Sequence, residues 1–156
     1  MKPASIKQIK TELENLLPEQ LLVLCMNLVK YKKENKELAT YLLFEANNEI
    51  LYIKEVKKNI DEIFEQMNTS NLYLAKKTLR KALRTTNKFI KYSDKKQSEI
   101  ELRIYFCQKM KKSKLKLIAN TVVGNMYQGQ IQRINKTLKT LHEDLQFDYL
   151  DEIKAL

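Results

Sequence analysis

The chain has 156 residues, of which 44% are hydrophobic and 31% charged, and its formal net charge at pH 7 is +10. This hydrophobic fraction is close to the average for globular domains, so the composition excludes an intrinsically disordered chain. Two glycines and two prolines are too few for the tight turns of a sheet or sandwich, which argues against an all-β fold.

The first predicted helix begins after Ser5. Ser5 and Gln8 have the spacing of a capping box, in which each side chain bonds the other residue's backbone N–H. The pattern predicts a short helix that ends near Leu16.

A second helix is predicted from Pro18 to about Lys33, because proline fits the first turn of a helix. Apolar residues occupy most of its circumference, so we expect it to pack on several sides. Cys25 lies in this helix, and Cys107 lies in a similar apolar run. Both are predicted to be buried free thiols, since two cysteines do not form a disulfide framework.

Two more helices are predicted before the basic part of the chain. Asn35 can cap a helix over 36–46, and the pair at 47–48 then interrupts it. A longer amphipathic helix follows, with apolar residues spaced three and four apart. These residues are Ile50, Ile53, Val56, Ile60, Ile63, Phe64 and Met67.

The fifth helix is predicted from about Asn71 to Tyr92, after a polar loop that can cap it. At 100° per residue, one side of this helix is apolar and is expected to face the core. That side consists of Ala75, Leu79, Leu83, Thr86 and Ile90.

Three segments complete the predicted fold. Asp94 and Gln97 have capping-box spacing and predict a sixth helix over 96–112. A seventh helix is predicted over 115–141, and the acidic tail 143–156 is predicted to form a last short helix folded back on the body. The residues expected to be buried in the sixth helix are Ile100, Leu102, Ile104, Tyr105, Phe106, Cys107 and Met110.

A weak internal similarity leaves the architecture open. The residues after Cys25 resemble those after Cys107. In each case a predicted helix ends in lysines and a second predicted helix follows. The fold is therefore predicted to be all-α, a single domain over 1–156 of about six to eight antiparallel helices. It is either a helical bundle or a short α-solenoid of stacked helical hairpins.

Positive charge is concentrated in one part of the chain. Between Asn71 and Thr140 there are eighteen Lys and Arg residues and three acidic residues, whereas the last sixteen residues contain five acids and one lysine. A field of one sign attracts polyanions and anionic surfaces. This imbalance is the main functional signal in the sequence.

The cations of the fifth helix share a face about 100° wide beside the apolar one. Like charges four residues apart each destabilise a helix by a few tenths of a kcal/mol, and no acid on this helix offsets them. We therefore predict a non-catalytic interaction module that binds a polyanion such as nucleic acid, or an acidic protein. The candidate binding residues are Lys77, Arg80, Lys81, Arg84, Lys88, Lys91, Lys95 and Lys96.

Two further observations bear on this prediction. Tyr73 and Tyr92 lie on the same helix and could stack on bases, although partly buried tyrosines are the commoner outcome. The alternative is a structural or scaffolding protein that binds another protein or self-associates. In that case the acidic tail 143–156, or the acids that precede the basic helix, would neutralise the stripe.

No motif in the sequence names a reaction, so we expect no enzyme activity, no cofactor and no metal site. The single histidine, His142, lies near a helix end, where it is expected to compensate terminal carbonyls. Glu45 and Glu49 are four apart but lack the companion histidine of a helical metal site, and are expected to lie on a solvated face.

The longest apolar run, Leu21 to Val29, spans nine residues, and a membrane span needs about twenty. The N-terminal residues have no apolar core typical of a signal peptide. We therefore expect a cytoplasmic protein without integral membrane association.

Overall fold

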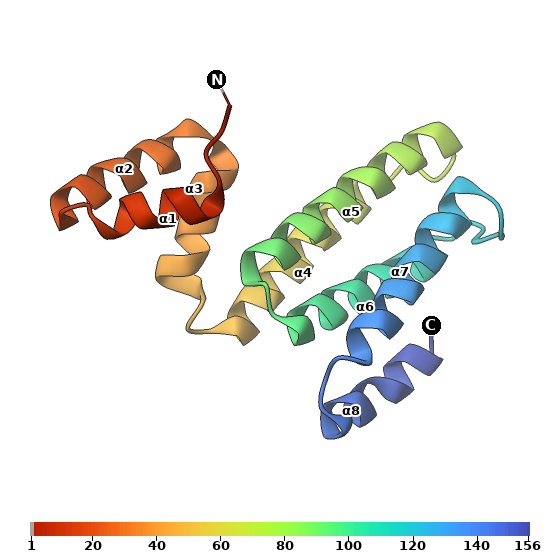
Figure 1. Cartoon of the computed structure of the whole chain (residues 1–156). Helices are drawn as coiled ribbons and strands as arrows, with labels where there is room; N and C mark the ends of the chain where they lie inside the picture. Colours follow the sequence, from red (N-terminus) through yellow and green to blue (C-terminus); the bar gives the residue numbers. More distant parts are fainter. Residues whose placement is uncertain (1) are drawn as a thin grey trace. The chain divides into compact units, whose positions relative to one another are not determined.

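The computed structural model describes residues 2–156 and is all-α, as predicted (Figure 1). Within these residues there are eight α-helices, one π-helical turn and no strand. The elements are α1 (Ile6–Glu14), α2 (Pro18–Tyr31), α3 (Lys33–Thr40), the π turn η1 (Tyr41–Glu45), α4 (Glu49–Glu65), α5 (Leu72–Ser93), α6 (Lys96–Lys112), α7 (Val122–Leu138) and α8 (Glu143–Lys154).

The chain divides into two compact units, Met1–Phe44 and Glu45–Leu156, of which Met1 lies outside the described residues. The N-terminal unit contains α1, α2 and α3, and the C-terminal unit contains α4 to α8. This division does not test the prediction of a single domain over 1–156, which stays a prediction.

The helix starts of the N-terminal unit follow local sequence signals. The predicted capping box is present: Gln8 N–H donates to Ser5 Oγ at 3.3 Å, and Ser5 N–H donates to Gln8 Oε1 at 2.9 Å. Pro18 occupies the first turn of α2, as expected. The prediction for Asn35 is wrong, because α3 begins at Lys33, three residues before the predicted start, and the Asn35 amide instead donates to the Leu28 carbonyl at 2.7 Å.

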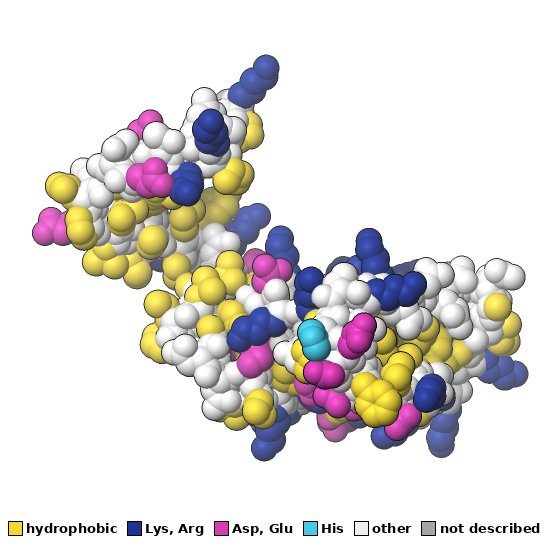
Figure 2. Space-filling view, turned by 60° about the horizontal axis from the view of Figure 1, so that its bottom comes forward, with side chains coloured by type: hydrophobic (Ala, Val, Ile, Leu, Met, Phe, Trp, Pro, Cys, Tyr) yellow, Lys and Arg dark blue, Asp and Glu magenta, His cyan; other side chains and the backbone are white. Residues whose placement is uncertain are grey.

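The expected close packing of α2 is also wrong. Among residues 2–44 only Tyr41 is buried, and Cys25 is exposed. Figure 2 shows hydrophobic side chains gathered on the surface of this unit. The reason is size, since the two other helices of this unit, α1 and α3, cannot surround α2 on all sides.

The core of the protein lies in the C-terminal unit, where α6 contacts α4, α5 and α7. The Phe64 and Phe106 rings pack edge to face there, with centroids 5.8 Å apart. Every residue expected to be buried in α6 is buried except Tyr105, which is half-buried. One cluster of buried core residues consists of Ile63, Leu79, Ala82, Ile100, Ile104, Phe106, Cys107, Met110, Val123, Tyr127, Ile134 and Leu138.

The amphipathic pattern of α4 predicted its buried face with one exception. Asn48 caps the helix by accepting from Leu51 N–H at 3.2 Å. Ile53, Val56 and Ile60 are buried as predicted, but Ile50 is 84% exposed. At 100° per residue, Ile50 lies roughly 60–160° around the helix from the buried residues of α4, so its side chain falls outside the buried face.

The junction between α5 and α6 differs from the prediction. Asp94 ends α5 in the left-handed conformation (φ 52°) and does not cap α6. The residue before α6 is Lys95, which makes no side-chain capping bond. The Asp94–Gln97 capping box is therefore wrong, although α6 itself has the predicted bounds.

The seventh helix begins later than predicted, at Val122 instead of 115. Lys114 and Asn120 have positive φ angles and interrupt the backbone, and Thr121 then caps α7 by accepting from Gly124 N–H at 3.1 Å. A Cβ at Gly124 would lie only 1.9 Å from the Ile118 carbonyl oxygen. Glycine thus allows the preceding connection to pass directly against the first turn of α7.

The acidic tail forms α8, as predicted, and its apolar side docks on the core. Tyr149 and Ile153 are partly buried against the core cluster. Lys111 Nζ donates to the Ala155 carbonyl at 2.8 Å, and Tyr127 Oη donates to the Leu156 carbonyl. These contacts fix the end of the chain beside α6 and α7.

The suggested internal repeat has no support in the structure. Cys25 is exposed whereas Cys107 is buried, so the two halves of the similarity lie in different environments. One residue separates α2 from α3, whereas the irregular connection 113–121 separates α6 from α7.

Candidate polyanion-binding surface

The predicted basic helix is α5, and local sequence sets both of its ends. Asn71 caps it by accepting from the N–H groups of Tyr73 (3.0 Å) and Leu74 (3.2 Å). The predicted core side is buried, with Leu83 only partly so, and Ala82 joins it. This orientation leaves the cationic side directed away from the core.

Most of the candidate cations of α5 are exposed. Among residues 2–156, five of them form no ion pair: Lys77, Arg80, Lys81, Arg84 and Lys91. We call these five residues the α5 stripe. Lys88 differs from them: it is half-buried, and its ammonium lies 4.8 Å from the centroid of the Phe89 ring.

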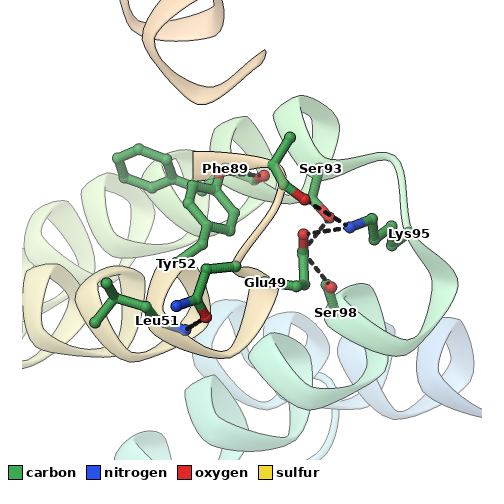
Figure 3. Close-up of polar contacts among 9 residues, drawn as sticks. Glu49, Leu51, Tyr52, Phe89, Ser93, Lys95 and Ser98 are labelled. Atoms are coloured by element: carbon green, nitrogen blue, oxygen red, sulfur yellow. Dashed lines mark hydrogen bonds and ion pairs between the residues drawn. The ribbon is translucent and has the colours of Figure 1, made fainter. Parts of the chain in front are cut away.

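Lys95 has a structural contact. Its Nζ lies 2.8 Å from Glu49 Oε2, and Glu49 Oε1 accepts from Ser93 and Ser98, each at 2.5 Å (Figure 3). These contacts join the start of α4, the end of α5 and the start of α6. The prediction that Glu49 lies on a solvated face is therefore wrong. Its carboxylate forms an ion pair with the ammonium group of Lys95.

Lys96 lies at the edge of a groove that sequence reasoning missed. Two hollows, of about 660 and 580 Å³, share Lys96, Glu99 and Arg133 in their linings. The larger hollow also reaches Lys91, and the smaller reaches Lys136. We call this region, formed by the end of α5, the start of α6 and the second half of α7, the basic groove.

A buried arginine forms the inner wall of the basic groove. Arg103 is 4% exposed, and its Nε donates to Glu99 at 2.8 Å. Its Nη1 donates to Asn87 at 3.0 Å and to Gln130 at 2.6 Å, so it links α5, α6 and α7. Because Glu99 is engaged with Arg103, it does not neutralise the exposed cations at the rim of the groove.

The cations at that rim are Lys91, Lys96, Arg133 and Lys136, which are exposed and form no ion pair within residues 2–156. Arg133 and Lys136 belong to α7, about forty positions after the α5 stripe. Only the packing of α7 on α6 brings them next to Lys96. No periodicity within one helix could have indicated this.

Several acids near the basic residues have other partners, whereas Asp94, which also lines the larger hollow, forms no ion pair within residues 2–156. Asp61 accepts from Tyr105 Oη at 2.7 Å and lies 2.7 Å from Lys109 Nζ. Burial alone would raise the pKa of Asp61, but the bonds from Lys109 and Tyr105 outweigh burial and lower it. Lys57 pairs with Glu101 at 2.5 Å. In the α8 tail, Asp151 pairs with Lys154 at 3.4 Å.

The two tyrosines have different environments. Tyr73 is 73% exposed at the start of α5, whereas Tyr92 is 8% exposed. Tyr73 is therefore accessible for stacking on a base, and the expectation that it would be partly buried is wrong. Tyr92 cannot stack on a base without leaving its site.

The other candidate chemical groups have structural contacts. His142 caps α8, with Nδ1 3.4 Å from Asp144 N, so it serves a helix start rather than terminal carbonyls. Burial raises the pKa of the Cys107 thiol to about 12, which keeps it protonated and unreactive. No group of three potential metal ligands occurs within residues 2–156.

The arrangement as a whole can attract anions, because exposed cations on three helices form no ion pair within residues 2–156 and outnumber the two acids of the groove, Asp94 and Glu99. Within residues 2–156, no helix is long and apolar enough to cross a bilayer. Comparison of the chain with protein-family models, curated proteins and solved structures finds no match.

Proposed function

We propose that this protein is a non-catalytic helical module that binds a polyanion such as nucleic acid. Binding uses the α5 stripe and the adjoining basic groove. The observation that carries the proposal is that these exposed cations form no ion pairs within residues 2–156.

The energetics of α5 favour this function. Arg80 and Arg84 are four residues apart, as are Lys77 and Lys81, and each such pair destabilises the isolated helix by roughly 0.2–0.5 kcal/mol. A polyanion removes this repulsion when it binds. It also releases its own condensed counterions, which is the main source of affinity at low salt.

The groove suggests how a ligand could be positioned. Phosphates along α5 would continue past Lys91 toward Lys96, Arg133 and Lys136, following the basic groove across three helices. Contacts of this kind fix the position of a nucleic acid but do not read its sequence. Tyr73, at the opposite end of α5, could stack on an unpaired base.

The first test is fluorescence anisotropy with labelled single-stranded RNA and duplex DNA, at about 50 and 200 mM salt. We expect binding that weakens steeply with salt. The double variant Arg80→Glu/Arg84→Glu should weaken binding at least tenfold, because it reverses two adjacent charges of the stripe.

The matched control is Lys54→Glu/Lys58→Glu on α4. These two lysines are also exposed, four residues apart and outside any ion pair within residues 2–156. The control changes the net charge by the same amount. Equal losses of affinity in both variants would therefore show that binding depends on net charge and not on the α5 stripe. Absence of binding at the lower salt would reject the proposal.

A third variant tests the groove itself. Arg133→Glu/Lys136→Glu alters only α7, whose exposed cations lie far from the stripe in sequence. A loss comparable to that of the Arg80/Arg84 variant would place the ligand along both elements. Unchanged affinity would restrict binding to α5.

The second candidate function is a scaffold that binds another protein or self-associates. One observation favours it: the N-terminal unit exposes a large apolar surface, which often marks an interaction site. This candidate predicts neutralisation of the α5 stripe by the acidic tail. Within residues 2–156, no ion pair joins the tail to the stripe.

A further inference from the structure

Helix α2 presents a continuous apolar stripe to solvent. Leu22 is 63% exposed, Val23 61% and Met26 44%. At 100° per residue these three side chains lie within about 100° of one another around the helix. Exposed apolar surface of this kind on a small unit is normally covered by another molecule.

The rest of the N-terminal unit has little core to stabilise it. Apart from Tyr41, its most enclosed apolar residues are only half-buried: Leu13, Leu16, Leu21, Leu24, Val29 and Ala39. Units of about forty residues seldom fold stably without a disulfide, a metal or association with another chain. Neither cysteine of the chain forms a disulfide, and residues 2–156 contain no group of three potential metal ligands, which favours association.

The charges of α2 are arranged symmetrically about this apolar stripe. Glu19 and Lys30 are the only charged residues of α2. Eleven positions separate them, so they lie within about 20° of each other around the helix, on the side of Val23 and Met26. Both are exposed, and within residues 2–156 neither forms an ion pair.

We propose that α2 pairs antiparallel with α2 of a second copy of this chain, about a two-fold axis that passes between Leu24 and Cys25. In this register Val23 of each copy faces Met26 of the other, and Glu19 of each copy faces Lys30 of the other. A two-fold interface requires such self-complementarity, because the same patch contributes to both sides.

The charge pattern favours a second copy over an unrelated partner. A face with an acid at one end and a base at the other is complementary to itself when reversed. Packed helices approach to about 8–10 Å between axes, a separation that brings the apolar stripes into contact and the end charges within reach. The inference is independent of polyanion binding, because α2 lies in the other compact unit from the basic surface.

The experiment begins with sedimentation velocity of the full chain over a range of protein concentrations, after removal of nucleic acid. We expect a concentration-dependent dimer. Glu19→Lys alone and Lys30→Glu alone should each weaken dimerisation by about tenfold, because each replaces two attractive contacts with two repulsive ones.

Mixing the two single variants gives the decisive result. In a heterodimer of Glu19→Lys with Lys30→Glu, every end contact is again between opposite charges. We therefore expect the equimolar mixture to dimerise more strongly than either variant alone. Each substitution also places an unfavourable charge at one end of α2. That effect cannot explain the recovery, because both chains keep their substitutions in the mixture.

The apolar stripe is tested by Val23→Gln/Met26→Gln, which should abolish the dimer. Phe147→Gln on α8 is the matched control, because Phe147 is 76% exposed and lies outside α2. A protein that remains monomeric at all concentrations would overturn the proposal. A dimer that is insensitive to the α2 substitutions, or a mixture that shows no recovery, would also overturn it.

Discussion

At the scale of single residues, the carboxylates of α4 organise the C-terminal unit. Glu49 accepts from Ser93, Ser98 and Lys95 and so joins the ends of three helices. Asp61, three turns further along α4, accepts from Tyr105 and pairs with Lys109 of α6. Both residues resemble surface acids in the sequence, and only their partners give them a structural role.

The contacts of Asp61 predict a pH dependence of stability. Its pKa is lowered in the folded protein, because the bonds from Lys109 and Tyr105 outweigh burial. A lowered carboxyl pKa stabilises the folded state above the pKa of the unfolded chain, and this contribution is lost as the pH falls through the folded value. Asp61→Asn should therefore be less stable than the wild type near neutral pH.

The measurement is urea denaturation of both proteins between about pH 6 and pH 2. We expect the difference in the free energy of unfolding to shrink as the pH falls and to nearly vanish at the acid end. Because Asp61 is partly solvent-exposed, the neutral-pH difference should be modest, about 1 kcal/mol. A difference that stays constant with pH would show that Asp61 acts by packing alone.

At the scale of elements, the start of α7 depends on one glycine. A Cβ at position 124 would lie 1.9 Å from the Ile118 carbonyl oxygen and 3.2 Å from Thr121 Oγ1. The connection 113–121 can pass against α7 only because that atom is missing. The two glycines of α7 read alike in sequence, yet only Gly124 meets a neighbour.

Gly124→Ala should therefore destabilise the protein by about 1–3 kcal/mol, because overpacking outweighs the better helix propensity of alanine. Gly129→Ala is the matched control, since a Cβ at that position would have no neighbour within 4 Å. That variant should be stabilised by about 0.5–1 kcal/mol. Thermal denaturation followed by circular dichroism measures both, and equal shifts of the same sign would refute the steric argument.

At the scale of the whole molecule, the distribution of charge determines which surfaces can bind anions. The acidic residues of α8 lie on an element whose apolar side docks beside α6 and α7. Within residues 2–156, the ion pair formed by its acids is that of Asp151 with Lys154, which belongs to the same helix. The basic surface and the acidic tail therefore have separate structural roles.

This separation predicts the effect of removing 143–156. The truncated protein should be less stable, because Tyr149 and Ile153 no longer cover the core, but it should bind RNA at least as tightly as the full chain. Combined with Arg80→Glu/Arg84→Glu, its effects on the free energy of unfolding should add within about 0.5 kcal/mol. Clear non-additivity, or lost binding on truncation, would favour neutralisation of the stripe by the tail.

Features that depend on neighbours along the chain could be predicted from the amino-acid sequence. The capping box at Ser5 and the position of Pro18 in the first turn of α2 follow from short-range rules, and periodicity predicted the buried side of α5. Helix formation and helix faces are local properties, because residues three or four apart meet on the same side. The α5 stripe was predictable for the same reason.

Tertiary structure decided what depends on partners distant in the chain. The exposure of Cys25, the contacts of Glu49 and the joining of Arg133 and Lys136 to Lys96 all depend on which helices pack together. A helix pattern shows that a side is apolar or basic, but whether that side is covered depends on surfaces far away in sequence. Helix α6 is therefore buried, because it packs on α4, α5 and α7, whereas α2 is exposed because it has few neighbouring helices.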